Sequence, residues 1–598
     1  MNRSRKYILF ISVIVLIAIS LFFFVKGDFR TSDGNNNTVM DNITFYRGEA
    51  KGIRLSPAPV DGVYNLFVPG CGTKSLYISC PSSLCLVLND QVRLSDGDDI
   101  MPHVTDISDE GNLYAAVKVL SSGDREVFNG YINFFLAGEL PSVHITVPGE
   151  DIKTINSENP EESTDKLHTT GMLTIVDPDG AVDCASEIDM SRRGNTSFLH
   201  MDVKPYNINL KRPMSVLGMR TAGKYALKAN SYDMNHLLRN EAALDMSRAT
   251  GMPVTCDSRF ADVYINGEYN GLYMITNRIK GDELIGLGGD GYLLELDYRY
   301  ETEDNYFVSH DQGIVVHYPE YPSEEKMEYI EALYNKAYEA IETDGDYESF
   351  IDVDSFMKMY LIQDFFCNVD VDYASFYFFL GDDGLFHAGP VWDFDLTDGI
   401  MQTLPFHEEL ARRSHIVPDR GGIFLDLLDN SPRFRERVRE YYLNEFSPIV
   451  EEYAEGLLLE KGRYTEKSLK ISDINNSFSF KGFHSLESAQ GLSEWILERD
   501  VFLKSFYEAP EEYVNVRFHF AWGDIRTLAK KGEALGYLPD SAHPDNDDSF
   551  WGEITGFEMA GHVPADEGFI PTEDTDLYAV YPPDAHAWAE GYAGTPDE

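Results

Sequence analysis

Positive charge is scarce in this chain. Its 598 residues include 49 Lys and Arg against 100 Asp and Glu, which gives a formal net charge of −51. A surface this acidic repels nucleic acid and anionic lipid headgroups, and it attracts divalent cations or basic partners. We therefore expect no nucleic-acid partner and look for chemistry among the carboxylates.

Cysteine is also rare, and the spacings that bind zinc are missing. The six cysteines include no CxxC pair, and the fifteen histidines form no HExxH motif. So few cysteines, irregularly spaced, do not make a disulfide scaffold. Cys71 and Cys80 are close enough in sequence to pair within one module, and we expect the other thiols to be buried.

One long hydrophobic run lies at the N-terminus. Arg3, Arg5 and Lys6 precede an apolar stretch over residues 7–25, which is as long as a membrane-spanning helix and longer than the core of a usual signal peptide. Because no small-x-small cleavage site follows, residues 1–26 are predicted to be an uncleaved signal anchor. The basic end would lie inside and the bulk of the chain outside. A cleaved signal peptide is the alternative, and it would make the protein secreted.

Composition divides the rest of the chain into four segments. Residues 27–42 are polar and predict a linker. Residues 43–140 hold short β-rich runs between turn residues, which predicts a β-sandwich-like domain. From 141 to 510 strands give way to helices around one acidic hairpin, which indicates a two-lobed α+β domain. Residues 511–598 change composition again and predict a small β module.

The acidic hairpin is the centre of the sequence. Two apolar runs, 376–379 and 385–390, are joined by an Asp-Gly turn, which is the signature of a β-hairpin. Asp370 precedes the hairpin and Asp393 follows it. The hairpin should therefore return Asp393 to the neighbourhood of Asp370.

The carboxylates after the hairpin are also patterned. If residues 392–395 are extended, Asp393 and Asp395 point the same way while Phe394 packs on the opposite face. Carboxylates beside buried aromatic side chains are costly unless they meet a cation or a metal. An acidic surface turn would explain any one of these residues, but the cluster favours a binding site.

Two further motifs concern phosphate. Residues 286–291 match GxGxxG by letter, but a dinucleotide fingerprint needs a strand before it and a helix after it. Residues 292–297 are strand-like, so we reject a dinucleotide site there. Arg193 begins an Arg-Gly-Asn-Thr-Ser turn, which offers a guanidinium group and backbone amides to a phosphate. An ordinary turn is the alternative.

Several segments, in order along the chain, resemble the spore coat protein CotH kinase family. The resemblance spans about residues 141–510. It implies an atypical protein-kinase-like fold that binds ATP and magnesium (or manganese) at a bacterial cell surface. The segments are Arg193-Gly194-Asn195-Thr196-Ser197, Lys204-Pro205-Tyr206-Asn207-Ile208, Leu217-Gly218-Met219, Ala229-Asn230, Leu238-Arg239-Asn240, Val263-Tyr264-Ile265-Asn266-Gly267-Glu268-Tyr269, Gly271-Leu272-Tyr273, Asn368-Val369-Asp370 and Pro390-Val391-Trp392-Asp393-Phe394-Asp395.

This resemblance implies roles for the central acids. Asp370 takes the place of the catalytic-loop Asp, and Asp393 that of the metal-binding Asp, with Asp395 beside it. Kinase catalytic loops carry a metal-binding Asn five positions after the Asp. Here that position is Ser375, whose hydroxyl is a shorter and weaker magnesium ligand.

Three residues are the expected nucleotide contacts. Arg193 and Lys204 would bind phosphate, and Trp392 would lie against the nucleotide. For each of the two cations alone, a structural salt bridge is an equal explanation.

The sequence thus predicts a membrane-anchored, extracellular protein kinase that transfers phosphate from ATP to Ser or Thr of surface or secreted proteins. One alternative is a non-catalytic surface or adhesion protein with a degenerate kinase-like core. Another is a DxDxT phosphohydrolase with Asp393 as nucleophile and Asp395 as acid/base. That chemistry needs the motif at the end of the first strand of a parallel sheet, which the Gly389-Pro390 interruption disfavours.

The C-terminal segment loosely resembles the InlB B-repeat modules, which are β-grasp domains of bacterial surface proteins. Tyr581 stands where those modules usually carry Trp. The matching pieces are Tyr537-Leu538-Pro539, Phe550-Trp551-Gly552 and Asp574-Thr575-Asp576-Leu577-Tyr578-Ala579-Val580-Tyr581.

Overall fold

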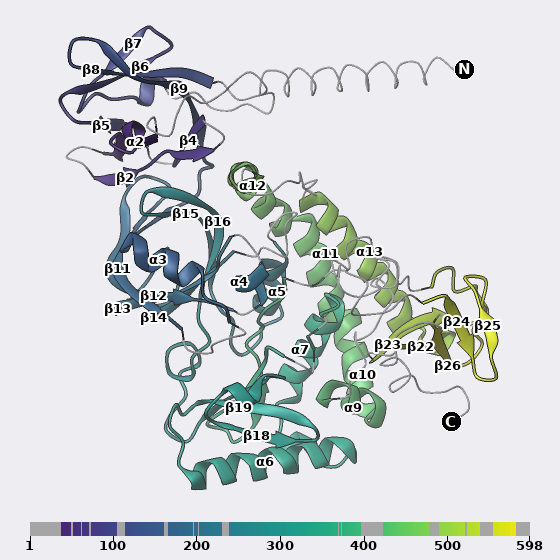
Figure 1. The fold of residues 1–598 in the computed structure, drawn as a ribbon. Coiled ribbons are helices and arrows are strands. Elements are labelled where there is room, and N and C mark those ends of the chain that lie inside the picture. The colour runs from purple at the N-terminus through teal and green to yellow at the C-terminus, as the bar shows by residue number, and fades with distance from the viewer. Residues whose placement is uncertain are drawn as a thin grey trace, which may run out of the picture. The chain divides into compact units, whose positions relative to one another are not determined.

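Figure 1 shows the fold of the protein in a computed structural model. By their internal contacts the residues form two compact units, residues 1–136 with 266–268, and residues 137–265 with 269–598. The predicted signal anchor lies outside the described residues, and within them no helix is long and apolar enough to cross a membrane. The described residues are 37–48, 52–60, 63–70, 73–103, 114–160, 166–194, 196–200, 203–229, 238–368, 370–371, 374–395, 397, 422–477, 489–520, 523–538 and 554–581.

The first unit is built from two sheets. One has three strands in the order β2-β1-β5, and the other has six in the order β3-β4-β9-β8-β6-β7. Cys80 is a free, buried thiol that lies 3.5 Å from the carbonyl oxygen of Leu84, and Cys71 is outside the described residues. The elements are α2 (Asn37–Met40), β1 (Thr44–Arg47), β2 (Ile53–Leu55), β3 (Ala58–Val60), β4 (Val63–Val68), β5 (Leu76–Ser79), β6 (Leu84–Leu88), β7 (Val92–Leu94), η1 (Met101–His103), β8 (Tyr114–Ser121) and β9 (Arg125–Leu136).

The second unit begins with a closed seven-stranded barrel, β10-β11-β12-β13-β14-β16-β15. An Asn-Gly turn joins β15 to β16, with φ of +54° at Asn266 and +89° at Gly267, as a tight hairpin requires. The elements are β10 (Ser142–Thr146), α3 (Gly149–Asn156), β11 (His168–Val176), β12 (Val182–Arg192), α4 (Thr196–His200), β13 (Tyr206–Met214), β14 (Ala222–Lys228), α5 (Arg239–Ala249), β15 (Ser258–Ile265) and β16 (Glu268–Asn277).

Alternation along the barrel strands decides which side chains can form a site. On β14, Tyr225 and Leu227 pack in the core of the barrel. Because successive strand residues point to opposite faces, Lys224 and Lys228 lie on the outer face of the barrel wall. Asn209 of β13 lies opposite Lys224 and shares that face.

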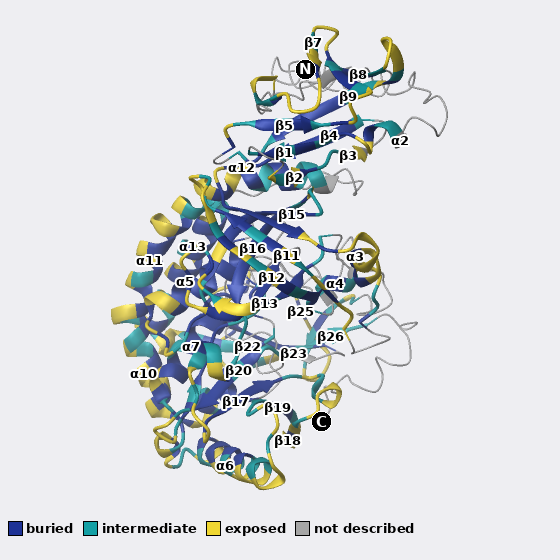
Figure 2. Ribbon diagram, turned by 90° about the vertical axis from the view of Figure 1, so that its left-hand side faces the viewer, coloured by how far each residue is buried: buried dark blue, intermediate teal, exposed yellow. Residues whose placement is uncertain are grey.

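A second sheet and a set of helices follow the barrel, which confirms the α+β class. The sheet order is β18-β19-β17-β20-β21, and one core joins this sheet to the helices. Helices α10 and α11 carry exposed residues on their outer side (Figure 2). The elements are η2 (Gly281–Ile285), β17 (Tyr292–Leu296), η3 (Tyr300–Thr302), β18 (Tyr306–Ser309), β19 (Gln312–Tyr318), α6 (Glu324–Glu342), η4 (Tyr347–Ser349), α7 (Val353–Phe365), β20 (Phe376–Leu380), β21 (Phe386–Ala388), α9 (Ile423–Asn430), α10 (Pro432–Tyr441), the π-helical η5 (Tyr442–Phe446), α11 (Ser447–Glu455), α12 (Leu457–Ser477) and α13 (Ala489–Glu508).

Several local predictions in this region are confirmed. The acidic hairpin is formed by β20 and β21, with Phe378 opposite Ala388. Ser323 caps α6 by accepting a hydrogen bond from the backbone N–H of Lys326 at 3.3 Å. β17 follows the GxGxxG letters directly, so the strand–turn–helix order of a dinucleotide fingerprint is missing there.

The C-terminal sheet packs against the end of the helical region. Its order is β23-β22-β26-β24-β25. The ring of Tyr513 lies edge-on to Phe502 and Phe506 of α13, at centroid distances of 6.2 and 5.6 Å, and Arg526 binds both carboxylate oxygens of Asp429 at 3.0 and 3.2 Å. The Phe-Trp-Gly piece of the predicted B-repeat resemblance lies outside the described residues. The elements are η6 (Pro510–Glu512), β22 (Tyr513–Phe520), β23 (Gly523–Lys530), β24 (Gly556–Met559), β25 (Val563–Ala565) and β26 (Thr575–Val580).

A histidine holds the acidic hairpin to the start of α7. His387 of β21 lies 3.1 Å from Asp352 through Nδ1, and 3.0 Å from Asp383 through Nε2. Hydrogen bonding to Asp352 is the main cause that raises the pKa of His387, and the same bond lowers the pKa of Asp352. Charged His387 therefore bridges two carboxylates.

We expect this bridge to make stability depend on pH. His387 contributes fully below its unfolded pKa of about 6.5, and the contribution is lost as pH rises through the raised folded pKa. Asp352 contributes above about pH 4, and its share is lost as pH falls through the lowered folded pKa. The loss of unfolding free energy in His387→Gln should thus be largest near about pH 5, on the order of 1 kcal/mol.

Denaturant unfolding at several pH values measures this difference. His103→Gln, at an exposed position of the first unit, is the matched control and should show little change at any pH. A His387→Gln loss that stayed the same from pH 5 to about pH 9 would mean that His387 is not charged in the bridge.

Candidate active site

Asp393 lies between two cations. Its Oδ1 is 3.0 Å from Nζ of Lys228, the last residue of β14, and 3.6 Å from Nη2 of Arg193, which follows β12. The side chain of Lys228 is only 4 % exposed. A lysine this deeply buried needs a counter-charge, and Asp393 supplies it.

The backbone at Asp393 is not the extended one that the sequence suggested. Asp393 has a φ of +64°, in the left-handed region that few residues other than glycine adopt. The predicted alternation of burial is nevertheless present, because Phe394 is buried while Asp393 and Asp395 are partly exposed. The left-handed turn, rather than a strand, presents the two carboxylates.

The acids influence one another. Burial would raise the pKa of Asp393, but attraction to Lys228 and Arg193 outweighs it and leaves that pKa lowered. Burial and the charge of Asp393 raise the pKa of Asp395 to about 7, and Asp370 acts in the same direction. Asp370, Asp393 and Asp395 therefore share one electrostatic environment.

Trp392 lies beside the same two cations. Nζ of Lys228 is 4.3 Å from the centre of its ring, and Cζ of Arg193 is 5.2 Å from it. Both distances suit cation–π contacts. The ring thus helps to hold the two side chains that face Asp393.

A buried asparagine ties three elements together at this point. Oδ1 of Asn240, near the start of α5, accepts hydrogen bonds from Nζ of Lys228 at 3.0 Å and from the backbone N–H of Phe394 at 2.9 Å. One oxygen therefore fixes both the lysine and the chain that carries Asp393. Neither Lys228 nor Asn240 was selected from the sequence as a site residue.

The loop that carries Asp370 is held from the other side. Arg499 of α13 is fully buried and donates hydrogen bonds to the carbonyl oxygens of Asp364 at 2.9 Å and Phe365 at 3.3 Å, at the end of α7. Oδ1 of Asn368 accepts from the backbone N–H of Asp370 at 3.2 Å. The end of α7 and the start of the loop are fixed together.

Ser375 and Lys204 are the remaining predicted residues. Ser375 stands immediately before β20 with a φ of +55°. Nζ of Lys204 lies 2.6 Å from the carbonyl oxygen of Phe198 and 5.2 Å from the centre of the Phe198 ring. The cations bound to Asp393 are Arg193 and Lys228.

The donor set suits a hard dication. Magnesium is bound through one or two carboxylates, with water and substrate phosphates as its other ligands. Asp393 and Asp395 offer such carboxylates, and a dication would offset the burial and the charge of Asp393 that raise the pKa of Asp395. Within the described ranges no group of three or more His, Cys, Asp or Glu side chains forms a ready-made metal site, so a metal here would depend on substrate ligands.

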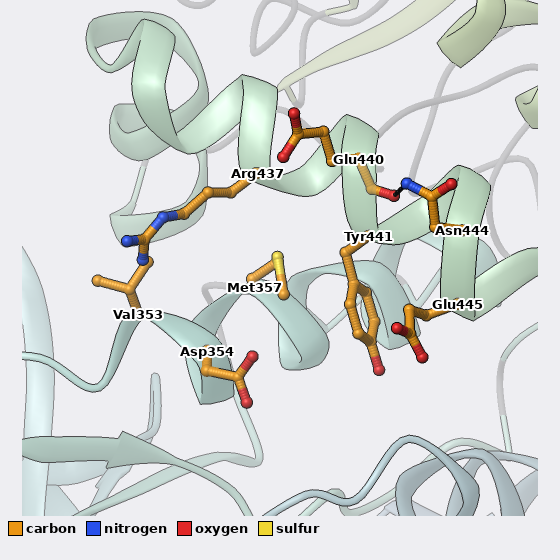
Figure 3. Close-up of a pocket in the computed structure, with 8 residues that line it drawn as sticks. All are labelled: Val353, Asp354, Met357, Arg437, Glu440, Tyr441, Asn444 and Glu445. Atoms are coloured by element: carbon orange, nitrogen blue, oxygen red, sulfur yellow. Dashed lines mark hydrogen bonds between the residues drawn. The ribbon is translucent and has the colours of Figure 1, made fainter.

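A cavity of about 340 Å³ lies elsewhere, between α7 and the α10–η5 segment (Figure 3). No residue of the Asp393 site lines it. Its wall carries both signs of charge, and Asp354 there is paired with Lys358 at 2.7 Å. Its lining residues are Val353, Asp354, Met357, Arg437, Glu440, Tyr441, Asn444 and Glu445.

Comparison with known proteins bears on this geometry. The family model described as CotH kinase protein matches residues 190–503. The matched range includes the residues around Asp393, from Arg193 to Asp395, and also Arg499, which holds the end of α7. A search of curated proteins found no match.

We expect Asn240 to be essential for holding Lys228 and the backbone of Phe394 together. Asn240→Ala removes the acceptor of two buried donors, so it should lower the unfolding free energy by about 1–3 kcal/mol. Asn444→Ala is the control, because Asn444 is exposed and donates only to the carbonyl oxygen of Glu440. It should change stability by less than about 0.5 kcal/mol. Equal losses in denaturant titrations of the two variants would contradict this role.

Proposed function

The chain belongs to the CotH kinase protein family, and we propose that it is an ATP- and magnesium-dependent protein kinase that phosphorylates Ser or Thr residues of surface or secreted proteins. The observation that carries the proposal is the position of Asp393 between Lys228 and Arg193, with Asp395 and Asp370 in the same electrostatic environment. Phosphoryl transfer relies on positioning and charge stabilisation by groups of these kinds.

The cations would bind the phosphates of ATP. Lys228 is a buried point charge held in one place by Asn240 and Asp393. Arg193 presents a planar guanidinium group that matches phosphate geometry. Trp392 fixes both side chains through its ring.

Asp393 and Asp395 would hold Mg²⁺ or Mn²⁺, with Ser375 as a third oxygen donor. When bound, the ion neutralises negative charge on the phosphates. Burial and the charge of Asp393 raise the pKa of Asp395 to about 7, and a dication at this position would offset both effects, which supports its binding there.

Asp370 would accept the proton of the acceptor. The hydroxyl oxygen of Ser or Thr forms a bond to the γ-phosphorus, and the bond from that phosphorus to the bridging oxygen of ADP breaks. The hydroxyl proton passes to the carboxylate of Asp370. Asn368 and Arg499 hold the loop in which Asp370 stands.

The acceptor is inferred from charge and from the N-terminus. The net charge of −51 would favour basic substrates, because long-range attraction speeds their association. The apolar run at residues 7–25 supports an anchor in a bacterial membrane with the kinase outside.

Two other functions were weighed against the site. A non-catalytic surface protein is favoured by one residue, Ser375, which stands where kinase loops carry the metal-binding Asn. For a DxDxT phosphohydrolase the motif should end a strand of a parallel sheet, whereas β17, β18, β19, β20 and β21 pair antiparallel to one another.

The direct test is phosphate transfer from γ-labelled ATP with Mg²⁺ or Mn²⁺, by the chain from residue 27 onward. Asp370→Ala and Asp393→Ala should each lower labelling by about 100-fold or more, because they remove the base and a metal ligand. Asp290→Ala, at an exposed position outside the site, should leave it unchanged. Labelling that survives both site substitutions would reject the assignment.

Nucleotide binding separates a kinase from a non-catalytic module. ATP with Mg²⁺ should raise the melting temperature of the parent protein by mass action. No shift and no labelling would support the adhesion alternative.

A second prediction concerns Ser375. Asparagine tolerates the left-handed backbone found there, and its amide oxygen reaches further than a hydroxyl. Ser375→Asn should lower the Mg²⁺ concentration for half-maximal labelling by about threefold to tenfold, because carbonyl oxygens are good magnesium ligands. Ser375→Ala should raise it. An unchanged Mg²⁺ dependence in both variants would remove Ser375 from the metal site.

A further inference from the structure

Three cations gather on the outer face of the barrel, beyond the site at Asp393. Lys224 lies on β14, and the backbone N–H of Arg278 donates to the carbonyl oxygen of Lys224 at 3.1 Å. Nη1 of Arg278 lies 3.4 Å from Oδ1 of Asn209. Lys280 follows two residues later. Among the described residues, no carboxylate oxygen forms an ion pair with any of the three, although acids outnumber bases two to one in the chain.

These cations repel one another. Burial, and then the charge of Arg193, lowers the pKa of Arg278. Burial lowers the pKa of Lys280, and the charges of Arg278 and Lys224 lower it further. All three side chains are half-buried. Partly buried cations without a counter-charge are costly, and an anion between them would offset this cost.

The nearby carboxylates do not fill that place. Oε2 of Glu283 accepts from the backbone N–H of Gly223 at 3.1 Å, and Oδ1 of Asp282 accepts from the backbone N–H of Glu283 at 2.9 Å. Asp282 and Glu320 act on Lys280, and Glu283 acts on Arg278, only through longer-range attraction. The positive charge of the group therefore remains available to a ligand.

The group continues the candidate active site along the barrel but is separate from it. Lys224 and Lys228 are four residues apart on one strand and share its outer face, which places their backbones about 13 Å apart. A phosphate held at Lys228 does not reach that far. Arg278 interacts electrostatically with both groups, because its charge lowers the pKa of Lys280 and the charge of Arg193 lowers its own pKa.

We propose that Lys224, Arg278 and Lys280 form a second anion subsite, in which Asn209 positions Arg278, and that it binds a phosphate group other than the one at Asp393. A guanidinium and two ammonium groups supply the charge-assisted hydrogen bonds that phosphate oxygens accept. The identity of the ligand depends on the proposed kinase function, in which this phosphate belongs either to the nucleotide or to an acceptor that already carries a phosphate monoester. The binding of an anion does not rest on it.

Inorganic pyrophosphate is the probe, titrated calorimetrically into the chain from residue 27 onward without divalent metal. The parent protein should bind about one more pyrophosphate per chain than Arg278→Gln with Lys280→Gln does. In that double variant the remaining affinity at the second subsite should be at least about tenfold weaker. Lys211→Gln, an exposed lysine of the same barrel that pairs with Glu187, is the matched control and should bind as the parent does.

Two arms then identify the source of the phosphate. If the double variant also weakens ATP binding, the nucleotide supplies the group. If ATP binding is unchanged while binding of a phosphoserine peptide is weakened, the acceptor supplies it. Either result supports the subsite. Circular dichroism verifies the fold, and Lys280→Arg, which keeps the charge, should retain binding.

Unchanged stoichiometry and affinity for pyrophosphate in a correctly folded double variant would overturn the subsite. This outcome differs from failure of the kinase proposal. A protein that binds pyrophosphate as expected but never transfers phosphate would lose the proposed function and keep the subsite.

Discussion

The charge of one buried lysine determines how the candidate site is arranged. Lys228 lies at the end of a barrel strand with almost no exposure, and such a charge is tolerated only if a counter-charge and a hydrogen-bond acceptor meet it there. Asp393 supplies the first and Asn240 the second. Because Asn240 also binds the backbone of Phe394, satisfying the lysine fixes the chain that carries both carboxylates. The left-handed turn at Asp393 is held by these contacts.

Asp370 is positioned by a separate set of contacts. Arg499 binds the last carbonyl groups of α7, and Asn368 binds the backbone of Asp370. One anchor comes from the helical region and the other from the barrel and α5. The two acids thus flank one hairpin but are anchored by different parts of the second unit. Positioning of this kind lowers the cost of ordering the site during a reaction.

The sequence was informative where the signals are local. The Asp-Gly turn predicted the β20–β21 hairpin, and the strand-like residues 292–297 predicted β17. Lys228 and Asn240 were missed because they meet only in three dimensions. A lysine ending a strand of alternating apolar residues, close to an Asn-rich motif, was the available signal. The extended backbone expected at Asp393 was wrong because pairing with Lys228 and Asn240 outweighs strand propensity, and no single-sequence pattern reports that balance.

The C-terminal sheet is joined to α13 by a short connection. β22 follows α13 after one short turn, and Tyr513 lies against Phe502 and Phe506 of that helix. Arg499 of the same helix donates hydrogen bonds to the last carbonyl oxygens of α7, shortly before Asp370. A displacement of this sheet would therefore be transmitted through α13 to the end of α7, where the loop that carries Asp370 begins.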